Sequence, residues 1–389
     1  MNIPEIQERL RAENIDGWLF FDHHARDPIA YRVLGLGPPG HVSRRWYYWL
    51  PAEGEPVKLV HAIEAARLDA IPGEKRRYSA WPQQRSELEQ ILSGATRIAM
   101  QYSPNCMIPY VSLVDAGTVD LVRGLGKEVV SSADLVQYFE ARWSAEQLET
   151  HREAGRRVDK VLREAFAMIG YRLRSGDAAS ETEVARFIRD LFEAEGLVTD
   201  DGPIVGVNAH SGDPHYNPTP ETSVPIQTGD FVLIDLWAKL DQPRSVYYDI
   251  TWTGFCGETP PSEIQNVFEI VTGARDVALA AADSAIREGR PIAGWEIDDV
   301  TREHITNAGF GEAFGHRTGH SIGEEVHGNG ANIDNLETRD ERPLIPRTCF
   351  SIEPGIYLAD FGVRSEIDCY VSDSGARATG AVQGEIVKI

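Results

Sequence analysis

Four acidic residues interrupt apolar, strand-like segments in the second half of this 389-residue chain. Asp235 lies in VLIDLWAKL, and Asp249 follows 14 residues later in SVYYDITWTG. Glu353 comes directly before the turn signal Pro354–Gly355, and Glu366 lies 13 residues further on. Burying an unpaired carboxylate is costly, so each acid needs a cation or hydrogen-bond donors. Taken singly, each acid is equally well explained by backbone amides that satisfy it or by a position on the surface.

Short polar segments connect these acids in two pairs. KLDQPRS, between Asp235 and Asp249, has the polar, proline-containing character of a hairpin loop. A loop around residues 360–362 separates Glu353 from Glu366 in the same way. If each pair of segments forms a hairpin, its two carboxylates face one another. The four acids therefore constrain the fold more than any other feature.

Three of the eleven histidines lie close together in HRTGHSIGEEVHG, residues 316–328. They are His316, His320 and His327. The glycines among them argue against a regular helix, so this is no helical HExxH zinc site. A glycine-rich segment lets the backbone approach a ligand and present a neutral imidazole. We therefore expect a site here, rather than three unrelated polar side chains.

Four carboxylates and one imidazole form an oxygen-rich ligand set. Such a set suits Mn²⁺, Fe²⁺, Co²⁺ or Zn²⁺ far better than a metal that selects thiolates. Four acids and a histidine are more than one catalytic ion needs, so we predict two ions that share carboxylates. Such a pair lowers the pKa of a bridging water and holds both oxygens of a tetrahedral intermediate.

The composition excludes several classes of partner and location. The formal net charge of −22 disfavours binding to nucleic acid or to an anionic membrane. No stretch approaches about 18 consecutive apolar residues, and the first residues lack the basic start and apolar run of a signal peptide. The four cysteines are scattered and form no CxxC pair, which predicts buried structural thiols. We expect a cytoplasmic protein.

The chain reads as two domains, residues 1–142 and 143–389. In the first, the pattern predicts a helix at 3–14, strands at 18–21, 97–100 and 128–130, and a hairpin of 46–50 with 56–60. In the second, Ser144 with Gln147 and Ser180 with Glu183 fit capping boxes that begin two helices, the first ending near residue 169 and the second before Gly196. Strands are expected at 203–208, 231–237 and 246–253, then helices at 261–287 and 295–307, then strands at 349–358 and 363–372. Two helices followed by strands, twice over, indicate an internal duplication.

The segments LIDLWA, YYDITWTG, TGHSIGEEVHG, SIEPGIY and GVRSEID carry a resemblance to a known superfamily. In this order they resemble the methionine aminopeptidase, prolidase and creatinase superfamily, the pita-bread hydrolases, over residues 144–389. The first 142 residues are similar to the extra domain of prolidases and creatinase, by length and layout. The resemblance implies an α/β (α+β) fold: a C-terminal pita-bread domain with a pseudo-twofold duplication and a smaller N-terminal creatinase-like α/β domain.

The resemblance also implies roles for the five predicted metal ligands. Asp235 would chelate one ion, His320 and Glu353 would hold the other, and Asp249 and Glu366 would bridge the two. A bridging water or hydroxide would attack the scissile carbonyl, and Glu353 would accept its proton. Manganese is the ion we expect first, with cobalt, zinc or iron as alternatives.

Four further residues match positions of the substrate pocket. His215, in GVNAHSGDPHYNPT, would contact the substrate amide or help to protonate the leaving nitrogen. His327 would stabilise the oxyanion, and His316 would line the pocket. Arg364 would bind the substrate carboxylate or form a salt bridge with a ligand carboxylate. The pair Arg44–Arg45 would serve the same carboxylate from a partner subunit, or would be an ordinary surface feature.

These implications favour a two-metal peptidase that cleaves short peptides at Xaa-Pro bonds, either as an Xaa-Pro dipeptidase or as an aminopeptidase. The family also implies a homodimer. The alternative is a metal-dependent hydrolase or lyase of a small C–N or osmolyte-like substrate. Metal-free chemistry and a binding module without catalysis are disfavoured, because all five ligand positions are filled.

Three departures from the family pattern lie near the predicted metal strands. The stretch between Asp235 and Asp249 is longer by about three residues. Trp252 replaces a common basic residue in DITWT, and Ile367 replaces the acid that usually follows Glu366. None removes a ligand, so we expect these changes to affect substrate choice more than metal binding.

Overall fold

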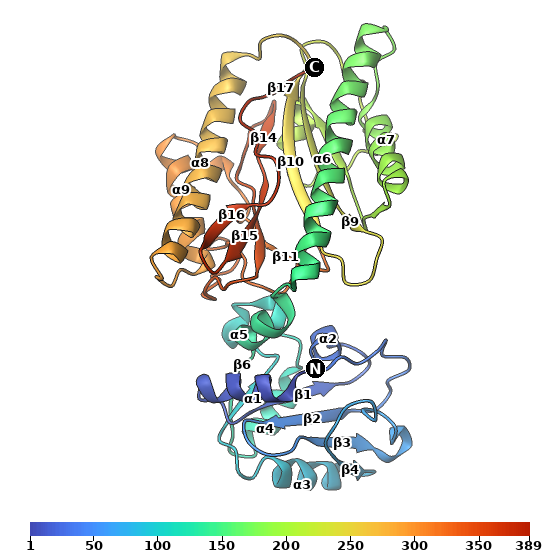
Figure 1. Ribbon diagram of the computed structural model, residues 1–389, viewed down its shortest axis with the longest axis vertical. Helices are drawn as coiled ribbons and strands as arrows, with labels where there is room; N and C mark the ends of the chain where they lie inside the picture. Colours follow the sequence, from blue (N-terminus) through green and yellow to red (C-terminus); the bar gives the residue numbers. More distant parts are fainter. The chain divides into compact units, whose positions relative to one another are not determined.

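The computed structural model describes residues 1–389, which form two compact units, Met1–Glu140 and Ala141–Ile389 (Figure 1). Each unit is described by itself. None of the helices is both long enough and apolar enough to cross a lipid bilayer.

The N-terminal unit is built on a six-stranded sheet with the order β4-β3-β2-β1-β5-β6. Its strands are β1 (Gly17–Asp22), β2 (Trp46–Pro51), β3 (Val57–His61), β4 (Glu74–Tyr78), β5 (Arg97–Met100) and β6 (Glu128–Ser131). Strand β2 is antiparallel to both neighbours, while all other neighbouring strands run parallel. The predicted hairpin and mixed sheet are therefore confirmed.

Both faces of this sheet are covered at its centre, which explains why β1 and β2 are so apolar. Trp18 and Phe20 of β1 point into one core, and Leu19 and Phe21 point into the other. The covering helices are α1 (Ile3–Ala12), α2 (Pro28–Leu34), α3 (Trp81–Ile91), α4 (Ala116–Arg123) and α5 (Ala133–Val136).

The first half of the C-terminal unit begins with helices α6 (Ala145–Arg174) and α7 (Glu181–Ala194). Both predicted capping boxes are present, at Ser144 with Gln147 and at Ser180 with Glu183. The two helices lie beside a sheet that includes β8 (Ile204–Val207), β9 (Phe231–Leu240) and β10 (Tyr248–Phe255) (Figure 1). Near the C-terminus, β17 (Val387–Lys388) returns to pair with β10.

The second half repeats this order with α8 (Ser262–Arg287), α9 (Gly294–Asn307) and a second sheet. That sheet contains β11 (Ser321–Ile322), β12 (Cys349–Ile352), β15 (Ile367–Ser372) and β16 (Gly375–Ala378). Figure 1 shows α8 and α9 side by side next to β15 and β16. Two helices followed by a sheet, twice over, confirm the predicted duplication.

The predicted strands 349–358 and 363–372 are wrong in one respect, because each is broken in two. β12 is followed by a separate β13 (Gly355–Tyr357), and β14 (Gly362–Arg364) precedes β15. Pro354 has no N–H to donate to a sheet, which favours the first break. The breaks contain Glu353 and Glu366, so these acids lie where the backbone leaves one sheet for another.

Candidate active site

Asp235 and Asp249 lie on the same face of the antiparallel β9–β10 hairpin. Asp235 is opposite Thr251 in the register, and Asp249 is opposite Trp237. Side chains two positions apart along a strand share one face, so both carboxylates are on the face that carries Thr251. Both residues are buried, with 8% and 4% of their surface exposed. The strand pattern that singled out these acids in the sequence thus brings them together.

Glu353 and Glu366 meet beyond the last paired residues of β12 and β15. Ile352 pairs with Ile367, and each acid lies one residue outside that pair. The Ser351 hydroxyl donates to Oε1 of Glu353 at 3.1 Å. The Thr251 hydroxyl donates to Oε2 of Glu366 at 2.8 Å, which ties this acid to β10 of the other half.

His320 reaches the same cluster from the segment before β11. Its Nε2 lies 3.3 Å from Oε1 of Glu353 and 3.7 Å from Oδ2 of Asp249. Its Nδ1 lies 3.3 Å from the carbonyl oxygen of Ser321, which can only accept, so Nδ1 carries the proton. Burial lowers the pKa of His320 well below its ordinary value. The ring is therefore neutral, and the lone pair of its Nε2 faces the carboxyl groups of Glu353 and Asp249.

Neighbours on both sides of His320 fix its position. A Cβ on Gly319 would lie 1.8 Å from the carbonyl oxygen of Ser351, so only glycine fits there. The backbone N–H and hydroxyl of Thr318 both donate to the buried Asp298, at 3.0 and 2.6 Å. Gly319, the glycine of the TGH segment, is thus required because the backbone of Ser351 packs against it, next to the predicted ligand His320.

The four acids of the cluster have more negative charge, when ionised, than the nearby positive charge can balance. Burial raises the pKa of Asp235, and it raises the pKa of Asp249 and Glu366 well above the ordinary range. The charge of Asp235 raises the pKa of Asp249 further. Burial also raises the pKa of Glu353 to about 7. Arg364 opposes these shifts, but one guanidinium faces four carboxyl groups.

The residues present fit divalent metal ions. Ligand atoms of Asp249, His320 and Glu366 all lie within 4.8 Å of one another. The second oxygen of Asp235, Oδ1, is buried and accepts no hydrogen bond. Such an orphaned carboxylate oxygen is costly unless a cation contacts it. Oxygen donors with one neutral imidazole are the set that manganese, iron, cobalt or zinc accepts.

Arg364 is committed to its neighbours. Its Nη2 donates to Oδ2 of Asp235 at 2.5 Å, its Nε to the Thr251 hydroxyl at 3.0 Å, and its Nη1 to the Tyr357 hydroxyl at 3.0 Å. Of the two roles expected for Arg364, the structure places it in the salt bridge with a predicted ligand. The Tyr357 hydroxyl in turn lies 2.7 Å from Nε2 of His316.

Tyr357 was not singled out from the sequence, although it ends the SIEPGIY segment. Nδ1 of His316 lies 2.7 Å from the Arg317 carbonyl, so it carries the proton and Nε2 accepts from Tyr357. Burial lowers the pKa of His316 to about 3 and raises that of Tyr357 to about 12. Two neutral groups, His316 and Tyr357, are therefore connected by hydrogen bonds to the salt bridge between Arg364 and Asp235.

His327 and His215 keep accessible side chains. The His327 ring stands edge-on to the His320 ring, with centroids 4.2 Å apart. Although His327 is exposed on one side, desolvation lowers its pKa to about 4, and the charges of Arg317 and His215 act in the same direction. The His215 side chain is exposed, and its backbone N–H donates to Asp213 at 3.0 Å. Both rings are thus open to a substrate, and the His327 ring contacts the His320 ring of the cluster.

Two of the three departures from the family pattern face away from this site. Trp252 follows Thr251, so its side chain is on the opposite face of β10, where it lines a cavity of about 340 Å³ with Phe166 of α6. Ile367 is packed in the core beside α8, with Phe350 and Ile352. The expectation that these changes affect substrate choice is therefore not supported by their positions.

A buried pair behind the cluster was also missed. Oδ2 of Asp368 accepts the backbone N–H of Asp249 at 2.8 Å and lies 3.8 Å from Nε2 of His151. His151 is fully buried, with Nδ1 2.6 Å from the Tyr247 carbonyl and Nε2 2.7 Å from the Thr379 hydroxyl. The sequence signal for Asp368 was present, since it lies two residues after Glu366 and so shares its strand face.

Known proteins resemble this chain in sequence and in fold. The model of metallopeptidase family M24 matches residues 149–373. A putative dipeptidase, YkvY of Bacillus subtilis (strain 168), is 33% identical over 226 residues, 56% of this chain and 58% of that protein. An Xaa-Pro dipeptidase of Lactobacillus helveticus is 32% identical over 227 residues, 58% of this chain and 56% of that protein. The chain thus spans less than two thirds of the length of these relatives.

Solved structures match over nearly the whole chain. Dipeptidase PepE from Mycobacterium ulcerans has a TM-score of 0.71 at 23% identity and covers 100% of this chain and 96% of its own. The X-prolyl aminopeptidase of Caenorhabditis elegans has a TM-score of 0.69 at 19% identity, covering 99% of this chain and 62% of its own. At these identities the likeness establishes a shared fold, in both the N-terminal sheet unit and the C-terminal unit.

Proposed function

The chain belongs to metallopeptidase family M24, and from that premise we propose that it is a dipeptidase that hydrolyses Xaa-Pro bonds with two divalent metal ions. The observation that carries the proposal is the buried cluster of Asp235, Asp249, His320, Glu353 and Glu366. Four carboxyl groups with raised pKa values can all be ionised beside one neutral imidazole only with added positive charge. Relatives named Xaa-Pro dipeptidase, at about 30% identity, support the choice of substrate.

The same five residues would hold the ions, with manganese as the ion we expect first. Bound divalent ions would supply Lewis-acid activation of a water molecule and of the scissile carbonyl. Glu353 would accept the proton of that water. Its side chain is 16% exposed, against 6% for Asp249, so it is the more accessible of these two carboxylates.

His327 and His215 would act on the substrate itself. A neutral His327 donates through one ring nitrogen, and we place that donor at the carbonyl oxygen, where negative charge develops. His215, on its exposed segment, would donate to the nitrogen that leaves as the proline amine. His316 is committed to Tyr357 and to the Arg317 carbonyl, so its contribution would be the wall of the pocket.

A dipeptide also needs a cation for its free carboxylate. Arg364 is the less suitable candidate, because its three nitrogens already donate to Asp235, Thr251 and Tyr357. Arg317 is better suited, since its ion pair with Glu337 is long, at 3.9 Å, and its charge lowers the pKa of both Glu353 and His327. We assign the carboxylate to Arg317, a residue that the sequence did not single out.

The alternative of a non-peptidase substrate comes from relatives on the creatinase scaffold, and the departures at Trp252 and Ile367 had strengthened it. Both side chains lie on faces opposite to the cluster, so these two departures do not favour it over the peptidase.

The test is a panel of peptides on metal-stripped protein that has been reloaded with Mn²⁺, Co²⁺ or Zn²⁺. We expect cleavage of Xaa-Pro dipeptides, much weaker cleavage of matched Xaa-Ala dipeptides, and none of Xaa-Pro tripeptides. Preferred cleavage of tripeptides would replace the dipeptidase by an Xaa-Pro aminopeptidase. No cleavage of any peptide by protein that binds two ions would overturn the peptidase.

We further infer a cytoplasmic homodimer, which the family resemblance implies. The C. elegans X-prolyl aminopeptidase is described as a cytosolic enzyme with a di-nuclear active site. Light scattering during size-exclusion chromatography tests the dimer: a mass of twice 43.2 kDa is expected, and a mass of 43.2 kDa contradicts it.

A further inference from the structure

The N-terminal unit has a sheet edge of the kind that binds ligands. Strands β1, β3 and β4 run in one direction and end at Asp22, His61 and Tyr78, so these residues lie along one edge. β2 runs the other way and begins at the same edge, directly after Arg45. In open α/β sheets, ligands bind in the crevice outside the carboxyl ends of the parallel strands.

A cavity of about 730 Å³ lies at this edge and is strongly basic. Its basic lining residues are His23, Arg26, Arg44, Arg45 and His61. The acid among the lining residues is Asp115, whose carboxylate caps α4 by accepting the N–H and hydroxyl of Thr118, at 2.9 and 2.8 Å. In a chain with a net charge of −22, three arginines around one cavity point to an anionic ligand.

The three arginines of this cavity form no ion pairs with acids of the protein. The neighbour of the Arg45 guanidinium is the neutral Tyr78 hydroxyl, which also lines the cavity. Arg44 donates only to the carbonyl and hydroxyl of the adjacent Ser43, at 2.9 and 3.2 Å. Guanidinium groups that lack an acidic partner are the usual recognition elements for carboxylate and phosphate groups.

His61 adds a donor of fixed tautomer. The backbone N–H of Ile63 donates to Nδ1 of His61 at 3.2 Å, so in the neutral ring the proton is on Nε2. Its ring stands edge-on to Tyr78, with centroids 5.0 Å apart, and Tyr78 also lines the cavity. Trp81, 72% exposed, lies at the same cavity and offers an apolar surface to the organic part of a ligand.

The segment that presents His23 and Arg26 is held in an unusual conformation. His24 and Ala25 both have left-handed backbone angles, with φ of 66° and 57°, which residues other than glycine rarely adopt. The buried Asp22 carboxylate fixes this turn. Its donors are the backbone N–H groups of Ala25, Arg26 and Asp27 and the Tyr31 hydroxyl, at 3.1, 2.7, 3.3 and 2.8 Å. The backbone from which these two basic side chains project is therefore fixed before any ligand binds.

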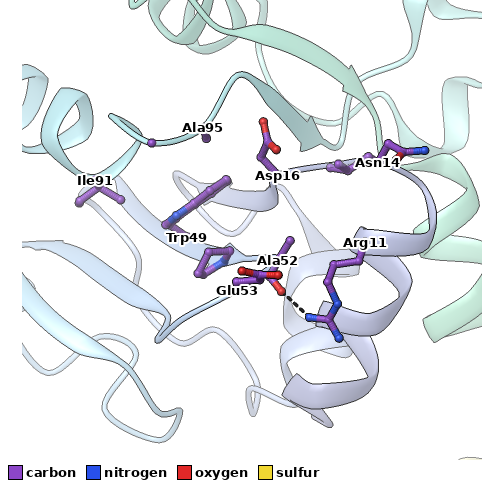
Figure 2. A pocket seen from close by; sticks show the side chains of 11 residues that line it. Arg11, Asn14, Asp16, Trp49, Ala52, Glu53, Ile91 and Ala95 are labelled. Atoms are coloured by element: carbon purple, nitrogen blue, oxygen red, sulfur yellow. Dashed lines mark hydrogen bonds between the residues drawn. The ribbon is translucent and has the colours of Figure 1, made fainter.

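A second cavity in the same unit provides a comparison, because its arginine is already hydrogen-bonded within the protein (Figure 2). Its arginine, Arg11, already donates to the carbonyl of Ala52 at 2.7 Å, as the dashed line in Figure 2 shows. One of its two acids, Asp16, accepts the backbone N–H groups of Thr96 and Arg97 at 2.7 and 2.8 Å. Arg11 and Asp16 are thus satisfied within the protein, and Arg11 is the one arginine or lysine among the lining residues.

We propose that the cavity at the carboxyl edge of the N-terminal sheet is a binding site for a small dianion, either a phosphate ester or a dicarboxylate. The site lies wholly within residues 21–121 and does not depend on the metal ligands. It goes beyond the proposed peptidase function. The rival interpretation, in which Arg44 and Arg45 receive the carboxylate of the peptide substrate, gives a different experimental result.

The test is calorimetric titration of the full-length, metal-free protein, in which phosphate has no metal ion to coordinate. Inorganic phosphate and malonate are the two probes, at an ionic strength held constant with chloride. We expect one saturable site for at least one probe, and the stronger probe tells the phosphate ester from the dicarboxylate. Arg45→Gln should weaken that binding by at least about tenfold, because it removes a charge-assisted hydrogen bond.

Arg77→Gln is the matched control, since Arg77 is exposed on β4, outside the cavity lining, and the change in net charge is identical. It should change the affinity by less than about twofold. Arg26→Gln is a second test variant, should Arg45→Gln lower the melting temperature. Absence of saturable binding, or equal losses in the Arg45 and Arg77 variants, would overturn the proposal. So would an Arg45→Gln variant that raises KM for a dipeptide while its affinity for both probes is unchanged.

Discussion

The two halves of the C-terminal unit repeat the same order of elements but hold their acids in different ways. In the first half, Asp235 and Asp249 lie inside two uninterrupted strands, β9 and β10. In the second half, Glu353 and Glu366 lie where strands are interrupted, outside the last pair of β12 and β15. In the first half, alternation along two paired strands therefore places the acids on one face. In the second half, the acids are placed by the backbone where it leaves one sheet for another.

The difference shows why a duplicated fold has one site, at the seam between its halves. Polar contacts cross this seam: Arg364 with Asp235, Thr251 with Glu366, and the N–H of Asp249 with Asp368. The positive charges that act on the cluster, Arg364 and Arg317, both belong to the second half. The acids of the first half are therefore buried against a counter-charge that the second half supplies, so the site depends on the packing of the two halves.

The largest effect is expected from removing a carboxylate of the continuous hairpin. Asp249→Ala should lower kcat/KM for a Xaa-Pro dipeptide by at least about a thousandfold, or about 4 kcal/mol of transition-state stabilisation. It should also reduce the bound metal below two ions per chain, as measured by elemental analysis. Asp241→Ala, in the exposed loop that follows β9, is the control and should change neither quantity. Retention of two ions by the Asp249 variant would show that the bridging role is wrong.

The next effect concerns the charged link across the seam. Arg364→Gln leaves the buried Asp235 carboxylate without its partner, so the metal-free protein should lose about 3–5 kcal/mol of unfolding free energy at pH 8. Urea unfolding measures this loss, and saturating Mn²⁺ should reduce it, because a cation replaces the missing charge. Arg244→Gln, which removes an exposed ion pair with Glu324, should cost less than about 1 kcal/mol. If Arg364→Gln costs the same unfolding free energy with and without Mn²⁺, the ion pair with Asp235 does not interact with the metal site.

A smaller effect is a pH dependence that comes from His151, which bonds to Tyr247 of the first half and Thr379 of the second. Burial lowers its pKa from 6.5 to about 4. Between these pH values the unfolded chain binds a proton that the folded protein does not, so stability falls as the pH falls. The loss by pH 4 is about 3 kcal/mol.

Unfolding free energies of the parent protein and of His151→Gln, measured at pH 7 and at pH 4.5, isolate this contribution. The difference between the two proteins should shrink as the pH falls, because only the parent protein has the histidine to charge. A difference that is the same at both pH values would contradict the prediction.

The smallest effect is expected on the outer faces of the two sheets. Trp252→Arg restores the basic residue common in the family, yet the ratio of kcat/KM for a dipeptide to that for a tripeptide should change by less than about twofold. The reason is that Trp252 packs towards α6, on the face opposite to Asp249. Tyr357→Phe, which breaks the link from Arg364 to His316, is the positive control and should change catalysis by more. A large change in the ratio for Trp252→Arg would mean that the outer face communicates with the site.

Much of the fold was predictable because its signals are local. The capping boxes at Ser144 and Ser180 bring together residues three apart, and the hairpin at 46–60 needs only strand runs and a short turn. The acids of the cluster were also recognisable, because a carboxylate in an apolar run is costly wherever the run is buried. Alternation along β10 already put Trp252 on the face opposite to Asp249, and this part of the sequence signal was overlooked.

The sequence by itself determined the chemical types at the site: four carboxylates, one imidazole and the glycine that makes room for it. Tertiary structure alone decided which groups surround them. Asp368 and His151 are joined to the cluster by contacts between segments that lie far apart in the chain, and Tyr357 meets His316, which is 41 positions away. The basic cavity of the N-terminal unit is similar, because strand order brings His23 and His61 to the edge where Arg45 lies. Local spacing fixes which side chains share a strand face, whereas the pairing of distant strands fixes what that face meets.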